Sequence, residues 1–447
     1  MDVNAEGKET DLVVRTEQPG DVVDGACSQE QHERKPVWKR LAFWMTIIGP
    51  GLMVMLADTD AGSIITAAQS GAEWRYAMLL PQLLLIPILY IVQEMTVRLG
   101  VVTHKGHGEL IREHFGMGWA LISVLTLFVA AVGALVTEFA GIAGVGEMLH
   151  ISPWITVPLV TVLLVWIGLS GSYRRVERIG IAVGLLELLF IPAAILARPD
   201  PSQLLHDLTN LPLGQGDYLF LLAANVGAVI MPWMVFYQQG AVVDKHLRGE
   251  RQLKVERWDT WLGAIITQIV MIAVVVAVAA NVEKTHANVT LNSIQDIAAV
   301  MQPSLGVVGA IVFCGLGMAG AGFLASLVVS LAGAWGIGEA FKMNRSLNMP
   351  FRKAKKFYII YTLAHVGGGL LVLSGVSLVS LTVDIEVMNA MLLPIVLGFL
   401  LALEQVALPR EERIRGWYKI VVWAVCLLVI GFGLYMAGYV VYQAFVH

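Results

Sequence analysis

Charged side chains are scarce in this sequence: Asp, Glu, Lys and Arg make up 14% of its 447 residues, whereas hydrophobic residues make up 57%. A soluble domain usually carries about 25% charged residues, and its core has no room for so much apolar surface. The mean hydropathy of +0.71 points the same way. We therefore predict a protein embedded in a lipid bilayer.

Cysteine is nearly absent as well. Cys27, Cys314 and Cys426 show no CxxC spacing, which predicts neither a disulfide framework nor a thiolate metal site. The ten histidines form no HExxH pattern, and no nucleophile–base motif or nucleotide-binding loop is present. We expect no enzyme activity, no cofactor, no nucleic-acid partner and no obligatory protein partner.

Long apolar stretches dominate the rest of the chain. A helix that crosses a bilayer needs about 20 mostly apolar residues. Eleven such stretches lie at 45–70, 76–99, 118–147, 153–170, 178–197, 217–242, 258–281, 304–336, 357–375, 379–406 and 417–442. They predict an all-α integral membrane protein with one transmembrane domain over 37–442. Residues 1–36 are polar and acidic without signal-peptide features, and we expect a disordered cytoplasmic tail there.

Positive charges test this partition independently, because Lys and Arg concentrate in cytoplasmic loops. With the N-terminus inside, 27 of the 30 Lys and Arg residues fall on the cytoplasmic side, and only Arg75, Arg198 and Lys284 fall outside. The distribution predicts a multi-pass protein of the cell membrane, with a cytoplasmic N-terminus and an extracytoplasmic C-terminus. The compact chain fits a prokaryotic inner membrane.

Two of the predicted helices are interrupted near their middle. The first contains Asp58 and Asp60 next to Gly62, and the sixth contains Pro232. Irregular backbone at this depth is tolerated where it lines a cavity, and an acid inside a membrane is a functional-site candidate. Paired interruptions predict an inverted-repeat, LeuT-like transporter, with helices one to five and six to ten as repeats and helix eleven appended. A simple proline kink at Pro232 is the alternative.

These motifs resemble the NRAMP divalent metal transporters over nearly all eleven helices. Gly49-Pro50-Gly51 and Asp60-Ala61-Gly62-Ser63 are similar to the family's GPG and DPGN, Ala228 to Trp233 to its A-x-x-M-P-H, and Arg98-Leu99-Gly100 to its RLG. The resemblance implies that a divalent metal ion is the partner. It implies as ligands Asp60, Ser63, the carbonyls of Ala57 and Ala228, the sulfur of Met231 and, eight residues before Pro394, Glu386.

Several positions depart from the family pattern. Ala61 replaces its proline, Ser63 its asparagine and Trp233 its helix-six histidine. In helix three, Glu138 and Gly141 stand where the family has the Asp and Glu of its proton path. These departures argue against tight proton coupling and resemble the NRAMP-related magnesium transporters.

The nature of the ligands suggests which ion is carried. Mg²⁺ prefers oxygen ligands and retained water, whereas a thioether favours softer ions. Ser63 leaves more room than Asn, and Glu386 adds an anionic oxygen, so we expect uncoupled import of Mg²⁺, with Mn²⁺ also accepted. A proton-coupled Mn²⁺/Fe²⁺ importer is the alternative. An organic-solute symporter of the same architecture is a distant one, because Asp60 disfavours it.

Other polar residues lie near the breaks in the sequence. Asp58, Trp233 and Glu138 are candidates for the outer shell or gate, and Asp58 fits an open vestibule equally well. Asp384 lies two residues before Glu386 and so faces away from it on a helix. We expect Gln93, Glu94 and Glu187 to form interhelical hydrogen bonds.

Overall fold

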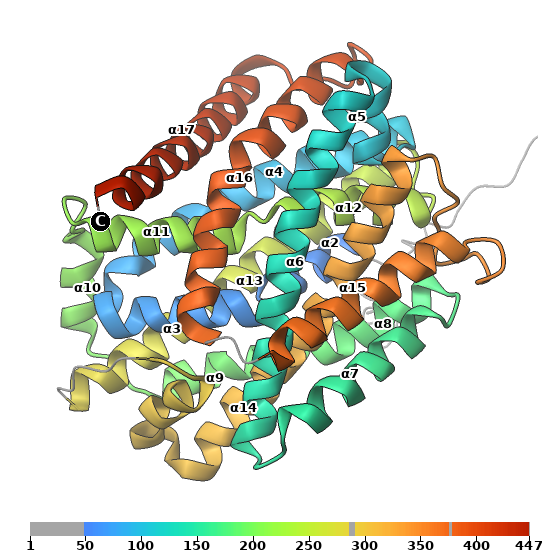
Figure 1. Cartoon of the computed structure of the whole chain (residues 1–447). Coiled ribbons are helices and arrows are strands. Elements are labelled where there is room, and N and C mark those ends of the chain that lie inside the picture. Colours follow the sequence, from blue (N-terminus) through green and yellow to red (C-terminus); the bar gives the residue numbers. More distant parts are fainter. Residues whose placement is uncertain (1–48, 286–290, 375–377, 447) are drawn as a thin grey trace, which may run out of the picture. The chain divides into compact units, whose positions relative to one another are not determined.

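The computed structural model describes residues 49–285, 291–374 and 378–446, in which all regular structure is helical (Figure 1). The all-α prediction is therefore confirmed for these residues. The predicted tail at 1–36 and Cys27 lie outside the described residues.

Each of the eleven predicted segments coincides with one helix or with helices joined end to end. In chain order these are α2 Pro50–Asp58 with α3 Ala61–Trp74; α4 Leu79–Thr103; α6 Met117–Met148; α7 Pro153–Gly168; α8 Tyr173–Gly184 with η2 Leu185–Leu189 and α9 Phe190–Leu196; α11 Gly216–Val229 with α12 Pro232–Asp244; α13 Gly249–Thr285; α14 Ile294–Ala340; α15 Lys355–Leu373; α16 Leu378–Val406; and α17 Gly416–Val446. Short connecting helices are η1 Arg75–Met78, α5 His107–Phe115 and α10 Pro201–Thr209.

The number of membrane crossings depends on the length and hydropathy of each helical stretch. Among the described residues, nine helical stretches are long and apolar enough to cross a membrane, and Pro153–Gly168 is a shorter apolar helix. One stretch runs from Ala61 to Thr103 and so joins two predicted segments. The count of eleven crossings stays a prediction.

The eighth segment begins earlier than predicted. The sequence pattern placed its start at 304, but α14 begins at Ile294, where Ser293 and Asp296 form a capping box. Gly306 interrupts the helix with φ 68° and ψ 168°, three residues after Pro303. Glycine adopts this backbone conformation without the penalty that a Cβ would bring, so two helical pieces follow each other across a kink.

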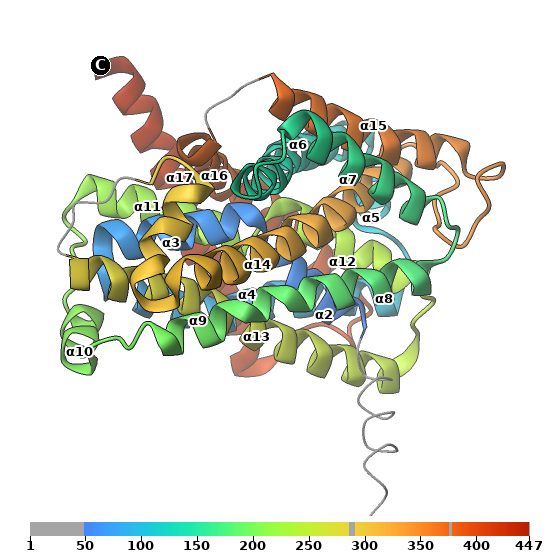
Figure 2. The same cartoon turned by 90° about the horizontal axis from the view of Figure 1, so that it is seen from below.

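Small residues bring the central helices close together, as is common between helices in membranes. A Cβ built on Gly322 of α14 would lie 3.2 Å from the carbonyl oxygen of Glu138 on α6. One built on Gly227 of α11 would lie 1.8 Å from the carbonyl oxygen of Glu386 on α16. The helix α17 packs against α16 at the edge of the bundle (Figures 1 and 2) in the same way, since a Cβ built on Gly433 would lie 2.6 Å from the carbonyl oxygen of Ala390. Close approaches of this kind therefore occur across the described helices as well as at the interrupted ones.

Candidate metal site

The first break separates α2 from α3. The α2 helix ends at Asp58, and Thr59 leaves helical geometry with φ −79° and ψ 52°. Asp60 is the N-cap of α3, and its Oδ1 accepts a hydrogen bond of 2.6 Å from the backbone N–H of Ser63. An acidic N-cap satisfies one of the free N–H groups that begin a helix. Asp60 therefore has a structural task besides any role as a ligand.

The second break separates α11 from α12. The α11 helix ends at Val229, Ile230 has φ −122° and ψ 75°, and Met231 is the N-cap of α12. Pro232 occupies the first position of α12, where its missing N–H costs nothing. The alternative of a simple proline kink is wrong, because two separate helices meet at this point.

The two breaks lie against each other. The hydroxyl of Ser63 donates a hydrogen bond of 2.9 Å to the carbonyl oxygen of Ala228. Asp60, Ser63, Ala228 and Met231 are all fully buried. Ala57 lies in the last turn of α2, where helix carbonyls lack intrahelical partners. The fold thus brings the predicted ligands of the two breaks together in a position closed to solvent.

Glu386 reaches the same position from α16. A Cβ built on Gly62 would lie 2.5 Å from Glu386 Oε1, and this oxygen has no partner among the described residues. The other oxygen accepts a hydrogen bond of 3.0 Å from the side chain of Asn389. Asp384 is exposed on the opposite side of α16, as the helical spacing predicts. Glu386 therefore adds an unpaired carboxylate oxygen beside Asp60.

Glu138 lies directly at the first break. Its Oε2 accepts a hydrogen bond of 3.1 Å from the backbone N–H of Ala61, and its carboxyl group lies within hydrogen-bonding reach of that of Asp60. Two carboxyl groups at this separation can share one proton in a hydrogen bond. At Gly141 there is no space for a side chain, because a built Cβ would lie 2.4 Å from the Cβ of Ala61.

The sulfur of Met231 already has a partner. The indole N–H of Trp233 donates to Met231 Sδ at 3.0 Å, and both side chains are fully buried. A sulfur that accepts a hydrogen bond has less electron density to offer to a metal ion. The residue in place of the family's histidine thus contacts the predicted soft ligand directly.

Two of the three predicted interhelical hydrogen-bonding groups do not behave as expected. Glu94 forms the predicted interhelical contact with Arg257 at 2.7 Å, and it also pairs with Arg98 on its own helix at 2.7 Å. The prediction is wrong for Gln93 and Glu187, whose side-chain polar atoms are buried without a partner among the described residues. Sequence periodicity indicates that such a residue faces the protein interior, but it does not show whether a hydrogen-bond partner is present there.

No described group of three or more His, Cys, Asp or Glu side chains converges to hold a metal ion. An ion at the breaks would therefore need backbone carbonyls, the Ser63 hydroxyl and water to complete its shell. This need matches the exposed carbonyls that interrupted membrane helices provide.

The backbone at the start of α2 is also held in place. The N–H of Leu52 donates a hydrogen bond of 2.9 Å to Asp259 Oδ2 on α13. A Cβ built on Gly49 would lie 2.9 Å from Glu256 Oε1, so the chain enters α2 in close contact with α13. These contacts lie at the end of α2 that the positive charges predict to be cytoplasmic.

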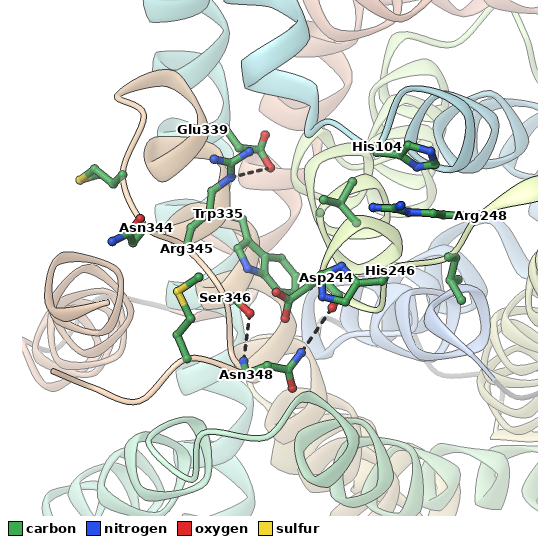
Figure 3. Close-up of a pocket in the computed structure, with 15 residues that line it drawn as sticks. His104, Asp244, His246, Arg248, Trp335, Glu339, Asn344, Arg345, Ser346 and Asn348 are labelled. Carbon is green, nitrogen blue, oxygen red and sulfur yellow. Dashed lines mark hydrogen bonds and ion pairs between the residues drawn. The ribbon is translucent and has the colours of Figure 1, made fainter. Parts of the chain in front are cut away.

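A cavity of about 530 Å³ lies elsewhere, at the C-terminal ends of α4, α12 and α14 (Figure 3). Its lining includes Asp244, His246, Arg248, Glu339 and Arg345. The guanidinium of Arg345 lies 3.7 Å from a carboxylate oxygen of Glu339. None of the predicted ligands lines this cavity, so it is separate from the occluded position at the breaks.

Comparison with solved structures identifies the fold. The chain is similar to a manganese transporter of Eremococcus coleocola, solved in complex with an aromatic bis-isothiourea substituted compound, with a TM-score of 0.69, 18% identity and coverage of 88% of this chain and 87% of that one. It is also similar to MHP1, a nucleobase-cation-symport-1 family transporter, with a TM-score of 0.53, 14% identity and coverage of 87% and 90%. These likenesses show the inverted-repeat transporter fold and confirm that prediction.

Curated relatives are described as transporters rather than enzymes. The chain is 30% identical over 224 residues to the divalent metal cation transporter MntH of Pediococcus pentosaceus, covering 47% of this chain and 49% of that protein. It is 25% identical over 299 residues to the MntH of Chromohalobacter salexigens, covering 65% and 69%. The matched segment thus spans about half the length of the first relative. The model of the Nramp family, natural resistance-associated macrophage protein-like, matches residues 51–438. The chain is a multi-pass membrane protein that belongs to the Nramp family.

Proposed function

We propose that this protein transports divalent metal cations across the membrane by alternating access. The observation that carries the proposal is the meeting of two helix breaks around Asp60, joined by the hydrogen bond from Ser63 to the Ala228 carbonyl. The position is fully buried, as an occluded state requires. One bundle of helices would rock against the rest, opening this position to each side in turn.

The descriptions of the relatives favour a manganese or general divalent cation substrate over the expected Mg²⁺. Two of them are described as divalent metal cation transporters and one as a manganese transporter. The shared reach of the Asp60 and Glu138 carboxyl groups also provides a place for a proton beside the ion. The proton-coupled Mn²⁺/Fe²⁺ importer is thus the better supported form of the proposal.

Purified protein in liposomes tests this form directly. Mn²⁺ uptake and internal pH are followed together under an inside-negative potential, which favours entry of a divalent cation by about 4.6 kcal/mol per 100 mV, twice the value for one charge. We expect Mn²⁺ entry with acidification of the interior. Mg²⁺ entry without any pH change would support the second candidate below, and absence of uptake of both ions would overturn the proposal.

Uncoupled Mg²⁺ import remains the second candidate because of one observation. The hydrogen bond from Trp233 to the Met231 sulfur occupies the soft ligand, whereas Glu386 offers an unpaired anionic oxygen. Hard ions bind such oxygen ligands, and soft ions gain most from a free thioether. The site would then favour Mg²⁺ because Mn²⁺ would lack a free thioether ligand.

Trp233→Phe tests whether the indole controls ion choice. The variant keeps an aromatic ring but loses the N–H that bonds to Met231. A neutral hydrogen bond is worth about 0.5–1.5 kcal/mol, so we expect the preference for Mn²⁺ over Mg²⁺ to rise roughly twofold to tenfold in competition uptake. Trp258→Phe is the matched control, because Trp258 is 69% exposed. An unchanged preference in Trp233→Phe would exclude the sulfur as a determinant of selectivity.

A further inference from the structure

Glu187 is held next to the first break by the packing of the fifth predicted segment on α2. A Cβ built on Gly180 would lie 2.9 Å from the methyl group of Met53, and one built on Gly184 would lie 3.5 Å from the Cβ of Leu56. The two helical segments therefore run alongside each other, residue 180 against 53 and residue 184 against 56. Three residues further, in η2, Glu187 reaches the level where α2 ends.

The carboxylate of Glu187 has no compensating partner there. The residue is fully buried, and both of its carboxylate oxygens lack a hydrogen-bond partner among the described residues. Asp58, which is 1% exposed, likewise has an unpaired oxygen, Oδ1. The charged groups that act on Glu187 are Asp58 and then Asp60, with no basic side chain among them. Burying an isolated carboxylate is very costly unless a cation or proton neutralises it.

The end of α2 adds to the negative character of this place. The last carbonyls of a helix lack intrahelical partners, and the C-terminus carries a partial negative charge that attracts cations. Asp58 is the final residue of α2. Two carboxylates and a helix C-terminus thus face one buried region, and all of these potential ligands are oxygens.

Charge balance favours a divalent over a monovalent ion. Five carboxylates are buried around the breaks: Asp58, Asp60, Glu138, Glu187 and Glu386. One divalent ion would leave three negative charges in a region that water does not reach. Two divalent ions would leave one.

We propose that Asp58, Glu187 and the carbonyl end of α2 form a second binding position for a hard divalent cation, next to the position at Asp60. The matching ion is Mg²⁺, because the available ligands are oxygens and it retains several waters of its own. The inference rests on the proposed transport of divalent cations and extends it to two ions per chain. Met231, at the other break, takes no part in this second position.

Counting bound Mg²⁺ tests the second position. Full-length protein in lipid nanodiscs is equilibrated with Mg²⁺ by dialysis, and the bound metal is measured by atomic absorption. We expect two Mg²⁺ per chain in the wild type and one in Glu187→Gln, which keeps the size of the side chain. Asp58→Asn should also bind one. Asp384→Asn is the matched control, since Asp384 is exposed on α16, and it should bind two.

The outcomes separate this inference from the proposed function. A single Mg²⁺ in the wild type, or two in Glu187→Gln, would overturn the second position. If the wild type binds one ion and still transports Mn²⁺ in liposomes, only the second position fails. If it binds two ions and transports neither Mg²⁺ nor Mn²⁺, only the proposed function fails. The ion that Glu187→Gln retains would also demonstrate that this variant is folded.

Discussion

Metal uptake should fall at least about a hundredfold in Asp60→Ala, because removing one partner of a buried charged contact costs about 3–5 kcal/mol. Asp60 is the acid at which the two helix breaks meet, and its Oδ2 has no hydrogen-bond donor among the described residues. The initial rate of Mn²⁺ or Mg²⁺ entry into liposomes measures the effect. We expect the helical content to stay unchanged by circular dichroism.

Asp60 also caps α3, so charge and capping must be separated. Asp60→Asn keeps an oxygen that can accept from Ser63 but removes the negative charge, and it should lose nearly as much uptake as Asp60→Ala. Asp200→Ala removes another acidic N-cap, which accepts from the Ser202 N–H at 2.9 Å on the exposed helix α10. This control should transport normally. Retained uptake in both Asp60 variants would contradict the assignment of Asp60 as a ligand.

Asp200 is a suitable control because its cap is formed by a charged group under the assay conditions. The backbone N–H of Ser202 and its hydroxyl donate to this carboxylate and hold the pKa of Asp200 below its ordinary value. The group is therefore ionised at neutral pH, like a ligand carboxylate. Comparing the Asp60 and Asp200 variants thus tests whether uptake needs a carboxylate at the helix breaks, because both variants lose a charged N-cap.

Much of the fold could be predicted from the sequence because membrane helices have a strong signal. Lipid excludes irregular backbone unless it is buried, so interruptions at corresponding positions of two apolar stretches indicate breaks, whereas Pro87, Pro158 and Pro394 lie inside continuous helices. The breaks at Asp60 and Pro232 were predicted in this way. The start of α14 was not, because its first turns precede Gly306, whose backbone conformation interrupts the helix. Hydrophobic periodicity does not predict that a helix continues on both sides of such a kink.

The site was predicted less completely than the fold. Glu386 could be found because its spacing from Pro394 resembles the family pattern. The contact between Trp233 and Met231 depends on side-chain rotamers of residues two positions apart, which helical spacing alone does not bring together. Glu187 was predicted to form an interhelical hydrogen bond, because the sequence indicates its burial but not that its carboxylate lacks a partner in three dimensions.

Gly227→Ala should disrupt the site by changing the packing of α11 against α16, the helix that carries Glu386. The added Cβ would lie 1.8 Å from the carbonyl oxygen of Glu386 and 2.7 Å from the backbone nitrogen of Ala390. Neither backbone atom can turn away as a flexible side chain can, so α11 and α16 must separate. We expect severe loss of uptake and a destabilisation of about 1–3 kcal/mol, typical of overpacking, measured by thermal unfolding in detergent.

The sign of this effect is not set by helix propensity. Alanine is favoured over glycine by about 1 kcal/mol inside a helix, so a helical glycine without close neighbours should gain stability from the same change. Gly398 on α16 is such a residue, since a built Cβ would meet nothing within 4 Å. Gly398→Ala should therefore transport normally and unfold at an equal or higher temperature. If Gly227→Ala behaved like Gly398→Ala, α11 and α16 would be able to separate without harm, and the close approach of Glu386 to the first break would not be needed for transport.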